Sequence, residues 1–196
     1  CEPMGMRFDF LAGPDRRIVD SVGYCTATGI LTPEALECLS DVRILAIESN
    51  HNEHMLLTGP YPYVLKQRVH GDSGHLSNEY TAQALSQLVG PNTRCVVGMH
   101  LSHENNRPSV AVRTLAEAIG AQPLNDAFTE AQTPDGTLAV CVASQDWTKS
   151  LKMRVCTLPR DVLRLNSASQ ACDNKKARKP WSSKIFSLCE VPVIGR

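Results

Sequence analysis

Short apolar runs alternate with helical patterns along most of the chain, and this alternation limits the folds open to it. The apolar runs lie at residues 42–48 (VRILAIE), 94–99 (RCVVGM) and 137–143 (TLAVCVA). Each has the length and composition of a buried strand. Amphipathic helices are predicted between them, at 77–89 and at 108–120, where Gly120 closes the second. This strand–helix–strand alternation predicts an α/β layer structure.

Further elements are expected around these runs. Two strands at 6–11 and 17–26 are joined by a Gly-Pro-Asp turn. Thr32 followed by Pro33 predicts a helix start, with the helix covering about 34–40. A short helix is expected after Asn50, and the Gly-Pro-Tyr-Pro run at 59–62 separates it from a helix over 63–70. Beyond Trp147 no clean period is present, and we expect an irregular extension.

The charges of the chain are divided unequally. Lys and Arg number 20, as do Asp and Glu. Residues 148–196 hold 11 basic and 3 acidic residues, a net charge of +8, whereas residues 1–147 hold 9 and 17, a net charge of −8. A hydrophobic content of 42% is ordinary for a globular protein. A flexible basic tail, a nucleic-acid-binding tail and a frameshifted or read-through segment remain alternatives for 148–196.

Cysteine usage and apolar run length bear on location. The chain has eight cysteines but no Cys-x-x-Cys pair and no Asn-x-Ser/Thr sequon. This pattern favours reduced thiols in a cytoplasmic protein over a secreted disulfide framework. No run approaches the roughly 18 apolar residues that a membrane helix needs, so no membrane partner is expected.

All six histidines fall between positions 51 and 103, in or beside three polar blocks. The blocks are 48–52 (ESNHN), 74–79 (GHLSNE) and 99–106 (MHLSHENN). Each follows a predicted strand or precedes a helix, so the three are expected to converge on one edge of the sheet. Imidazole and carboxylate groups suit zinc or manganese, and a bound metal would promote hydrolysis of a phosphoryl or acyl group.

The histidines differ in what their surroundings favour. His75 and His100 are framed by small polar residues and are predicted to be functional. His54 and His70 are interpreted as ordinary surface histidines. For His103 both readings stay open, because it shares a face with His100 only if that segment is helical.

Four segments resemble one family when taken in order. They are 48–56 (ESNHNEHML), 59–68 (GPYPYVLKQR), 74–79 (GHLSNE) and 100–108 (HLSHENNRP). Together they resemble the YycJ/WalJ-type hydrolases of the metallo-β-lactamase fold. The resemblance implies an αββα sandwich, of which residues 1–147 are expected to be the C-terminal half. It also implies a metal-dependent hydrolase that uses zinc or manganese and acts on phosphodiester bonds of DNA as a 5′→3′ exonuclease.

The resemblance also assigns roles to individual residues. His100 corresponds to a metal-binding histidine of the fold, and Glu48 with His75 to a pair that protonates the leaving group. The substrate side would be lined by Asn50, His51, Ser102, Asn105 and Asn106.

Two departures from the family pattern shape the expected activity. The His-x-His-x-Asp-His run that supplies most metal ligands is not in this chain, and Ala27 stands where the family has a metal-bridging aspartate. We therefore expect half of a domain with an incomplete metal site and self-association through an exposed sheet face. The alternative is a non-catalytic half-domain that acts as a binding module through its basic tail.

Overall fold

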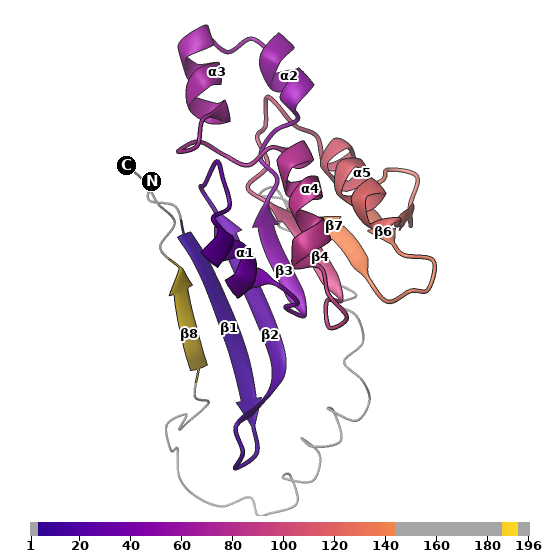
Figure 1. Ribbon diagram of the computed structural model, residues 1–196. Coiled ribbons are helices and arrows are strands. Elements are labelled where there is room, and N and C mark those ends of the chain that lie inside the picture. The colour runs from indigo at the N-terminus through magenta and orange to yellow at the C-terminus, as the bar shows by residue number, and fades with distance from the viewer. Residues whose placement is uncertain (1–3, 144–185, 192–196) are drawn as a thin grey trace, which may run out of the picture.

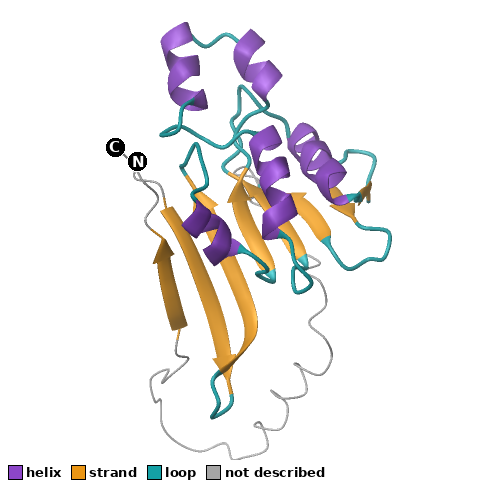
Figure 2. Cartoon of the chain, viewed as in Figure 1, coloured by secondary structure: helices purple, strands orange, loops and turns teal. Residues whose placement is uncertain are grey.

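One mixed sheet organises the structure, a computed structural model that describes residues 4–143 and 186–191 (Figures 1 and 2). The described part of the chain forms an eight-stranded sheet in the order β5-β6-β7-β4-β3-β2-β1-β8. The strands are β1 (Met4–Ala12), β2 (Arg17–Thr26), β3 (Ile44–Glu48), β4 (Cys95–Met99), β5 (Gln122–Pro123), β6 (Glu130–Gln132), β7 (Ala139–Val142) and β8 (Phe186–Val191).

The central strands β2, β3, β4 and β7 run parallel, so their carboxyl ends share one edge. The β1–β2 pair is a hairpin closed by a turn in which Gly13 has φ of +77°. Glycine adopts this left-handed conformation without the Cβ clash that other residues incur. β8 pairs with β1 in antiparallel fashion at the sheet edge.

Five described helices connect or flank the strands. They are α1 (Pro33–Leu39), α2 (Glu53–Thr58), α3 (Tyr63–His70), α4 (Asn78–Leu88) and α5 (Pro108–Ile119). Side-chain oxygens of Thr32, Asn52 and Ser77 cap α1, α2 and α4, each accepting from the backbone N–H three residues on. Gly120 ends α5 in the left-handed region with φ of +68°.

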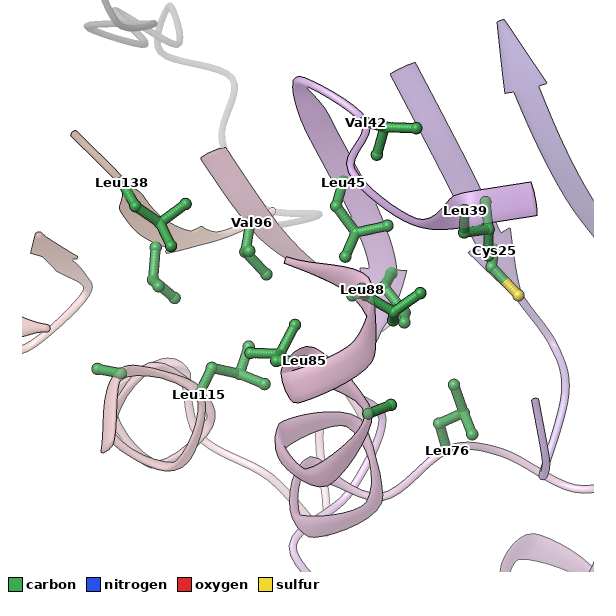
Figure 3. Packing of buried hydrophobic residues seen from close by; sticks show 14 of the residues in the cluster. Cys25, Leu39, Val42, Leu45, Leu76, Leu85, Leu88, Val96, Leu115 and Leu138 are labelled. Carbon is green, nitrogen blue, oxygen red and sulfur yellow. The ribbon is translucent and has the colours of Figure 1, made fainter. Parts of the chain in front are cut away.

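The core lies between the sheet and the helices on one of its faces. Helices α1, α4 and α5 lie on that face, while α2 and α3 stand beyond the carboxyl ends of the strands (Figure 1). Leu39, Leu45, Leu85, Val96 and Leu115 are among the buried side chains that interlock between the layers (Figure 3). Burial of each such side chain stabilises the fold by about 1.5–3 kcal/mol.

The opposite face of the sheet has no described helix over it. Strand register places Met6, Tyr24, Ala46, Val97 and Cys141 side by side in one row. Gly23, one residue before Tyr24, faces Leu39 of α1, so this row points away from the helices. All five residues are partly buried.

The predicted α/β class is confirmed, and every strand and helix expected up to residue 143 is present. The strands β5, β6 and β8 were not predicted. β8 falls inside the extension expected to be irregular; residues 144–185 and 192–196 of that extension lie outside the described part. The division at residue 147 and the sandwich partner sheet stay predictions. No helix among the described residues is long and apolar enough to cross a membrane.

Candidate active site

A buried carboxylate marks the carboxyl edge of the parallel strands. Glu48 is the last residue of β3 and pairs with Met99, the last residue of β4. Its side chain is 0% exposed. A buried carboxylate needs hydrogen-bond donors to replace its lost hydration, and the polar blocks that surround Glu48 supply them.

Four N–H groups point at this carboxylate. Nδ1 of His75 lies 2.8 Å from Glu48 Oε1, and Nδ1 of His100 lies 2.6 Å from the same oxygen. The backbone N–H of Thr28 donates to Oε2 at 3.1 Å, and that of Leu76 lies at 3.5 Å. Four donors use the full lone-pair capacity of a carboxylate.

The loop between α3 and α4 carries His75 to this position. The N–H of His75 donates to the Val69 carbonyl at 2.9 Å, which fixes the loop to the last turn of α3. The N–H of Gly29 donates to the Asp72 carbonyl at 3.0 Å, which joins the loop to the end of β2. A Cβ at Gly29 would lie 2.0 Å from the Gly71 carbonyl oxygen, so only glycine allows this approach.

His100 reaches Glu48 from the other side through an unusual backbone conformation. It directly follows β4 and has φ of +55°, a region that few residues other than glycine occupy, although histidine does so more often than most. The amide of Asn50 donates to the His100 carbonyl at 2.7 Å and holds this turn. Strained backbone supported by a specific hydrogen bond is a frequent feature of functional sites.

The shared carboxylate fixes the tautomer of both imidazoles. Since Glu48 Oε1 accepts from both Nδ1 atoms, each neutral ring has its lone pair on Nε2. The side chains of His75 and His100 are 31% and 43% exposed, whereas Glu48 is fully buried. The two rings pack edge to face with centroids 5.0 Å apart. The two imidazoles are therefore partly open to solvent, while the carboxylate that orients them is buried.

Glu48, His75 and His100 form a group that could hold a metal ion, with one ligand atom from each within 4.8 Å of the others. The donor set, two imidazole nitrogens and a carboxylate, fits zinc and manganese. Metal-bound histidines commonly donate their second N–H to a carboxylate, and Glu48 is placed to accept it. Ala27, at the end of β2 with φ of +60°, offers no ligand atom.

A network of amides ties the three polar blocks together. Asn106 donates through Nδ2 to the Ser49 and Asn50 carbonyls, both at 2.9 Å, and contacts Asn78 Oδ1 at 3.0 Å. Ser49 Oγ donates to the same Asn78 oxygen at 2.6 Å. The predicted convergence of the blocks on one edge is thus confirmed. The amide contacts of Asn106 are internal, and its substrate contact stays a prediction.

The side chains of two other predicted residues are buried without hydrogen bonds among the described residues. His51 is 0% exposed, and neither ring nitrogen has a partner among the described residues. The Asn105 amide, in a residue 1% exposed, is likewise without a partner in that part of the chain. Desolvation, followed by the positive charges of His70 and His75, lowers the pKa of His51 to about 4. His51 is therefore a neutral imidazole at physiological pH.

The remaining predicted residues are partly buried or exposed. Ser102 is partly buried and its Oγ accepts from the N–H of Asn105 at 3.1 Å. His103 lies in a turn rather than a helix, so the condition for its sharing a face with His100 is not met. His54 and His70 are exposed, as expected for surface histidines.

Sequence patterns did not reveal three residues of the site. Thr28 binds Glu48 through its backbone N–H, and Asn78 joins the amide network. Cys25 is buried near Glu48, and desolvation, reinforced by that carboxylate, raises its pKa to about 12, so its thiol stays neutral. The position of Asn78, directly after the Ser77 helix cap, is a sequence signal that could have placed it at the site. Backbone donors such as Thr28 carry no such signal.

Known proteins share part of this sequence. No family model matches the chain. Over 99 residues, 50% of this chain, it is 34% identical to the exodeoxyribonuclease WalJ of two Streptococcus pneumoniae strains, covering 37% of each. Over 94 residues, 48% of this chain, it is 30% identical to the exodeoxyribonuclease YycJ of Bacillus anthracis, covering 36% of that protein. The chain thus carries a YycJ/WalJ-type match over about half its length and over little more than a third of these relatives.

Proposed function

We propose that this chain contributes the proton-transfer half of a metal-dependent phosphodiesterase centre that acts on DNA. The observation that carries the proposal is the single buried carboxylate oxygen that accepts Nδ1–H from both His75 and His100. The similarity to proteins named exodeoxyribonucleases supports a nuclease-like activity. Because the chain spans little more than a third of those relatives, the activity of the whole protein is itself part of the proposal.

Glu48 acts here as an orienting group rather than as a ligand. Its contacts to the two imidazoles, at 2.6 and 2.8 Å, have hydrogen-bond length. An oxygen engaged in this way holds each ring with Nε2 directed away from it. The same negative charge stabilises a protonated imidazole, which is the form that a general acid needs.

His100 and His75 then have different tasks. His100 would hold the metal through Nε2, while the hydrogen bond from Nδ1 to Glu48 keeps its ring in place. The bound metal, zinc or manganese, supplies Lewis-acid stabilisation of the phosphoryl group. His75, in its protonated form, would release its Nε2 proton to the departing oxygen while Glu48 retains the Nδ1 hydrogen bond.

The experiment measures hydrolysis of DNA by the full chain in manganese or zinc. His75→Asn removes the proposed proton donor, and Gln87→Asn, at an exposed residue at the end of α4 remote from the cluster, is the control. We expect His75→Asn to lower the rate by about 10²–10⁴-fold, the usual contribution of general acid catalysis. Equal rates for the two variants would contradict the assignment.

A second measurement separates metal binding from turnover. The chain lacks the His-x-His-x-Asp-His run, and Ala27 replaces a further ligand that the resemblance implies, so weak turnover is expected. Titration of manganese or zinc should then show binding that His100→Asn abolishes and His54→Asn leaves unchanged. Metal binding that survives His100→Asn would remove His100 from the site.

A cytoplasmic location stays a prediction, as does self-association through the uncovered sheet face. The alternative role as a binding module rests on the basic extension, which lies outside the described residues apart from β8.

A further inference from the structure

We propose that the segment 54–71, called here the α2–α3 lobe, is a platform for single-stranded DNA beside the Glu48–His75–His100 cluster. The inference rests on the proposed nuclease function and adds the site that holds the strand. The lobe contains α3 and all of α2 except its first residue. It stands beyond the carboxyl ends of the strands, the edge at which the cluster lies (Figure 1).

The lobe is unusually apolar on its surface. Seven large hydrophobic side chains are exposed in the described part of the chain, and four of them belong to the lobe: Leu57, Tyr63, Val64 and Leu65. Tyr63 is 73% exposed and Val64 79%. Neither α2 nor α3 packs broadly against another described element. An exposed tyrosine ring is a group on which nucleic-acid bases stack, with little dependence on sequence.

The charge of the lobe suits a polyanion. Residues 54–71 hold Lys66 and Arg68 and no acidic residue; of the two carboxylates that border the segment, Glu53 accepts from Ser77 Oγ at 3.0 Å and Asp72 is exposed. Lys66 donates to the Leu57 carbonyl at 2.6 Å, so it also braces the two helices. Arg68 is exposed on α3.

The lobe is joined directly to the reactive cluster. The Val69 carbonyl accepts from the N–H of His75 at 2.9 Å, so the last turn of α3 positions that histidine. His70 packs edge to face on His51, with ring centroids 6.3 Å apart. The two ring nitrogens of His51 have no partner among the described residues, and they lie at the junction of lobe and sheet. A strand held on α3 would therefore lie beside the loop that carries His75.

The test compares binding of DNA to the full chain and its variants without divalent metal. The probe is a 5′-phosphorylated oligothymidine of about 12 nucleotides, within the site size of single-strand-binding proteins. Tyr63→Ala should weaken binding by about 5- to 150-fold, the range for loss of one base stack, while Tyr63→Phe should bind like the wild type. Leu124→Ala, at an exposed apolar residue outside the lobe, is the matched control.

Salt dependence tests the charged contact separately. Arg68→Ala should reduce the slope of log affinity against log salt by about 0.7, the value for one phosphate contact on a single strand. Arg17→Ala, at an exposed arginine of the β1–β2 hairpin, should leave the slope unchanged. Wild-type affinity in both Tyr63→Ala and Arg68→Ala would overturn the proposal. So would a Tyr63→Ala variant that changes only the oligomeric state, since the lobe would then be an interface between copies.

The two proposals fail in different ways. Hydrolysis of bis(para-nitrophenyl) phosphate needs no strand platform. A wild-type chain that shows neither hydrolysis of this ester nor binding of manganese or zinc, but loses DNA binding in Tyr63→Ala, would leave the platform standing and refute the phosphodiesterase centre. A chain that hydrolyses it, but binds DNA equally well in Tyr63→Ala and Arg68→Ala, would refute the platform alone.

Discussion

Replacement of Glu48 by glutamine tests the shared-carboxylate geometry directly. The side chain keeps its size but offers one acceptor oxygen and one NH₂ donor. If the oxygen faces the N–H groups of Thr28 and Leu76, the NH₂ group meets the two imidazoles. His75 and His100 must then turn Nδ1 into an acceptor and carry their protons on Nε2. In the reverse orientation the NH₂ group faces the backbone N–H groups of Thr28 and Leu76, which cannot become acceptors.

The magnitude follows from the burial and the partners of Glu48. The carboxylate is 0% exposed and receives contacts from four N–H groups. Hydrogen bonds to a charged group contribute about 1.5–3 kcal/mol each. Loss of the charged acceptor should therefore lower the free energy of unfolding by about 2–4 kcal/mol. A protonated Nε2 cannot bind a metal, so metal affinity should fall by about 10–100-fold, as for the loss of other supporting carboxylates.

Nitrogen NMR of the imidazoles reports the tautomer without any need for turnover. In the wild-type chain His75 and His100 should carry the proton on Nδ1, and in Glu48→Gln on Nε2. Urea unfolding gives the stability difference, and His54, which is exposed, serves as an internal reference ring. The reasoning is refuted if the wild-type chain already carries the proton on Nε2 of both rings, or if Glu48→Gln unfolds within about 0.5 kcal/mol of it.

Three further predictions concern neighbouring positions. The pKa of His51 is about 4, against 6.5 in the unfolded chain, so the unfolded chain binds more protons between these two pH values. The free energy of unfolding should have its full value above pH 6.5 and fall by about 2 kcal/mol by pH 5. A His51→Phe variant whose urea midpoint kept this dependence on pH would contradict the assignment. Ala27→Asp should raise the affinity for manganese at least tenfold, since aspartate supplies a ligand and tolerates a φ of +60°. Calorimetry measures this affinity, and an unchanged value would show that residue 27 does not face the metal. Gly29→Ala should move the loop that carries His75, because the added Cβ would meet the Gly71 carbonyl oxygen at 2.0 Å, and a His75 NMR signal identical to that of the wild type would count against this.

Local sequence patterns predicted most of the fold because the hydrophobic period and the capping residues of most segments agree with the elements that they form. The run at 42–48 became β3, and the predicted helix at 63–70 is α3. Ser77 and Gly120 mark helix ends as their cap geometries require. The short strands β5 and β6 were not predicted because a run of two or three residues is too short to show a hydrophobic period. β8 was missed because pairing with β1, far away in the sequence, decides its conformation.

The candidate site was predictable in its membership but not in its arrangement. Strand ends placed Glu48 and His100 at one edge, and the resemblance paired Glu48 with His75. That one oxygen accepts from both histidines follows only from the left-handed turn at His100 and the approach of Gly29 to the 71–75 loop. Neither leaves a trace in hydrophobic periodicity. The burial of the His51 ring, with no hydrogen-bond partner among the described residues, is equally invisible in sequence, because polar residues are expected outside.

The pairing of β8 with β1 has a consequence for how the chain folds during synthesis. Its register joins Gly5 to Val191, so this edge of the sheet closes only after residue 191 has left the ribosome. Strands β3 and β4, which carry Glu48 and precede His100, are linked by nearer segments and can assemble earlier. Until β8 arrives, the backbone groups along the outer edge of β1 remain open to strands of other chains. Aggregation of nascent or truncated chains should thus begin at β1, at a distance from the strand ends that carry the reactive cluster.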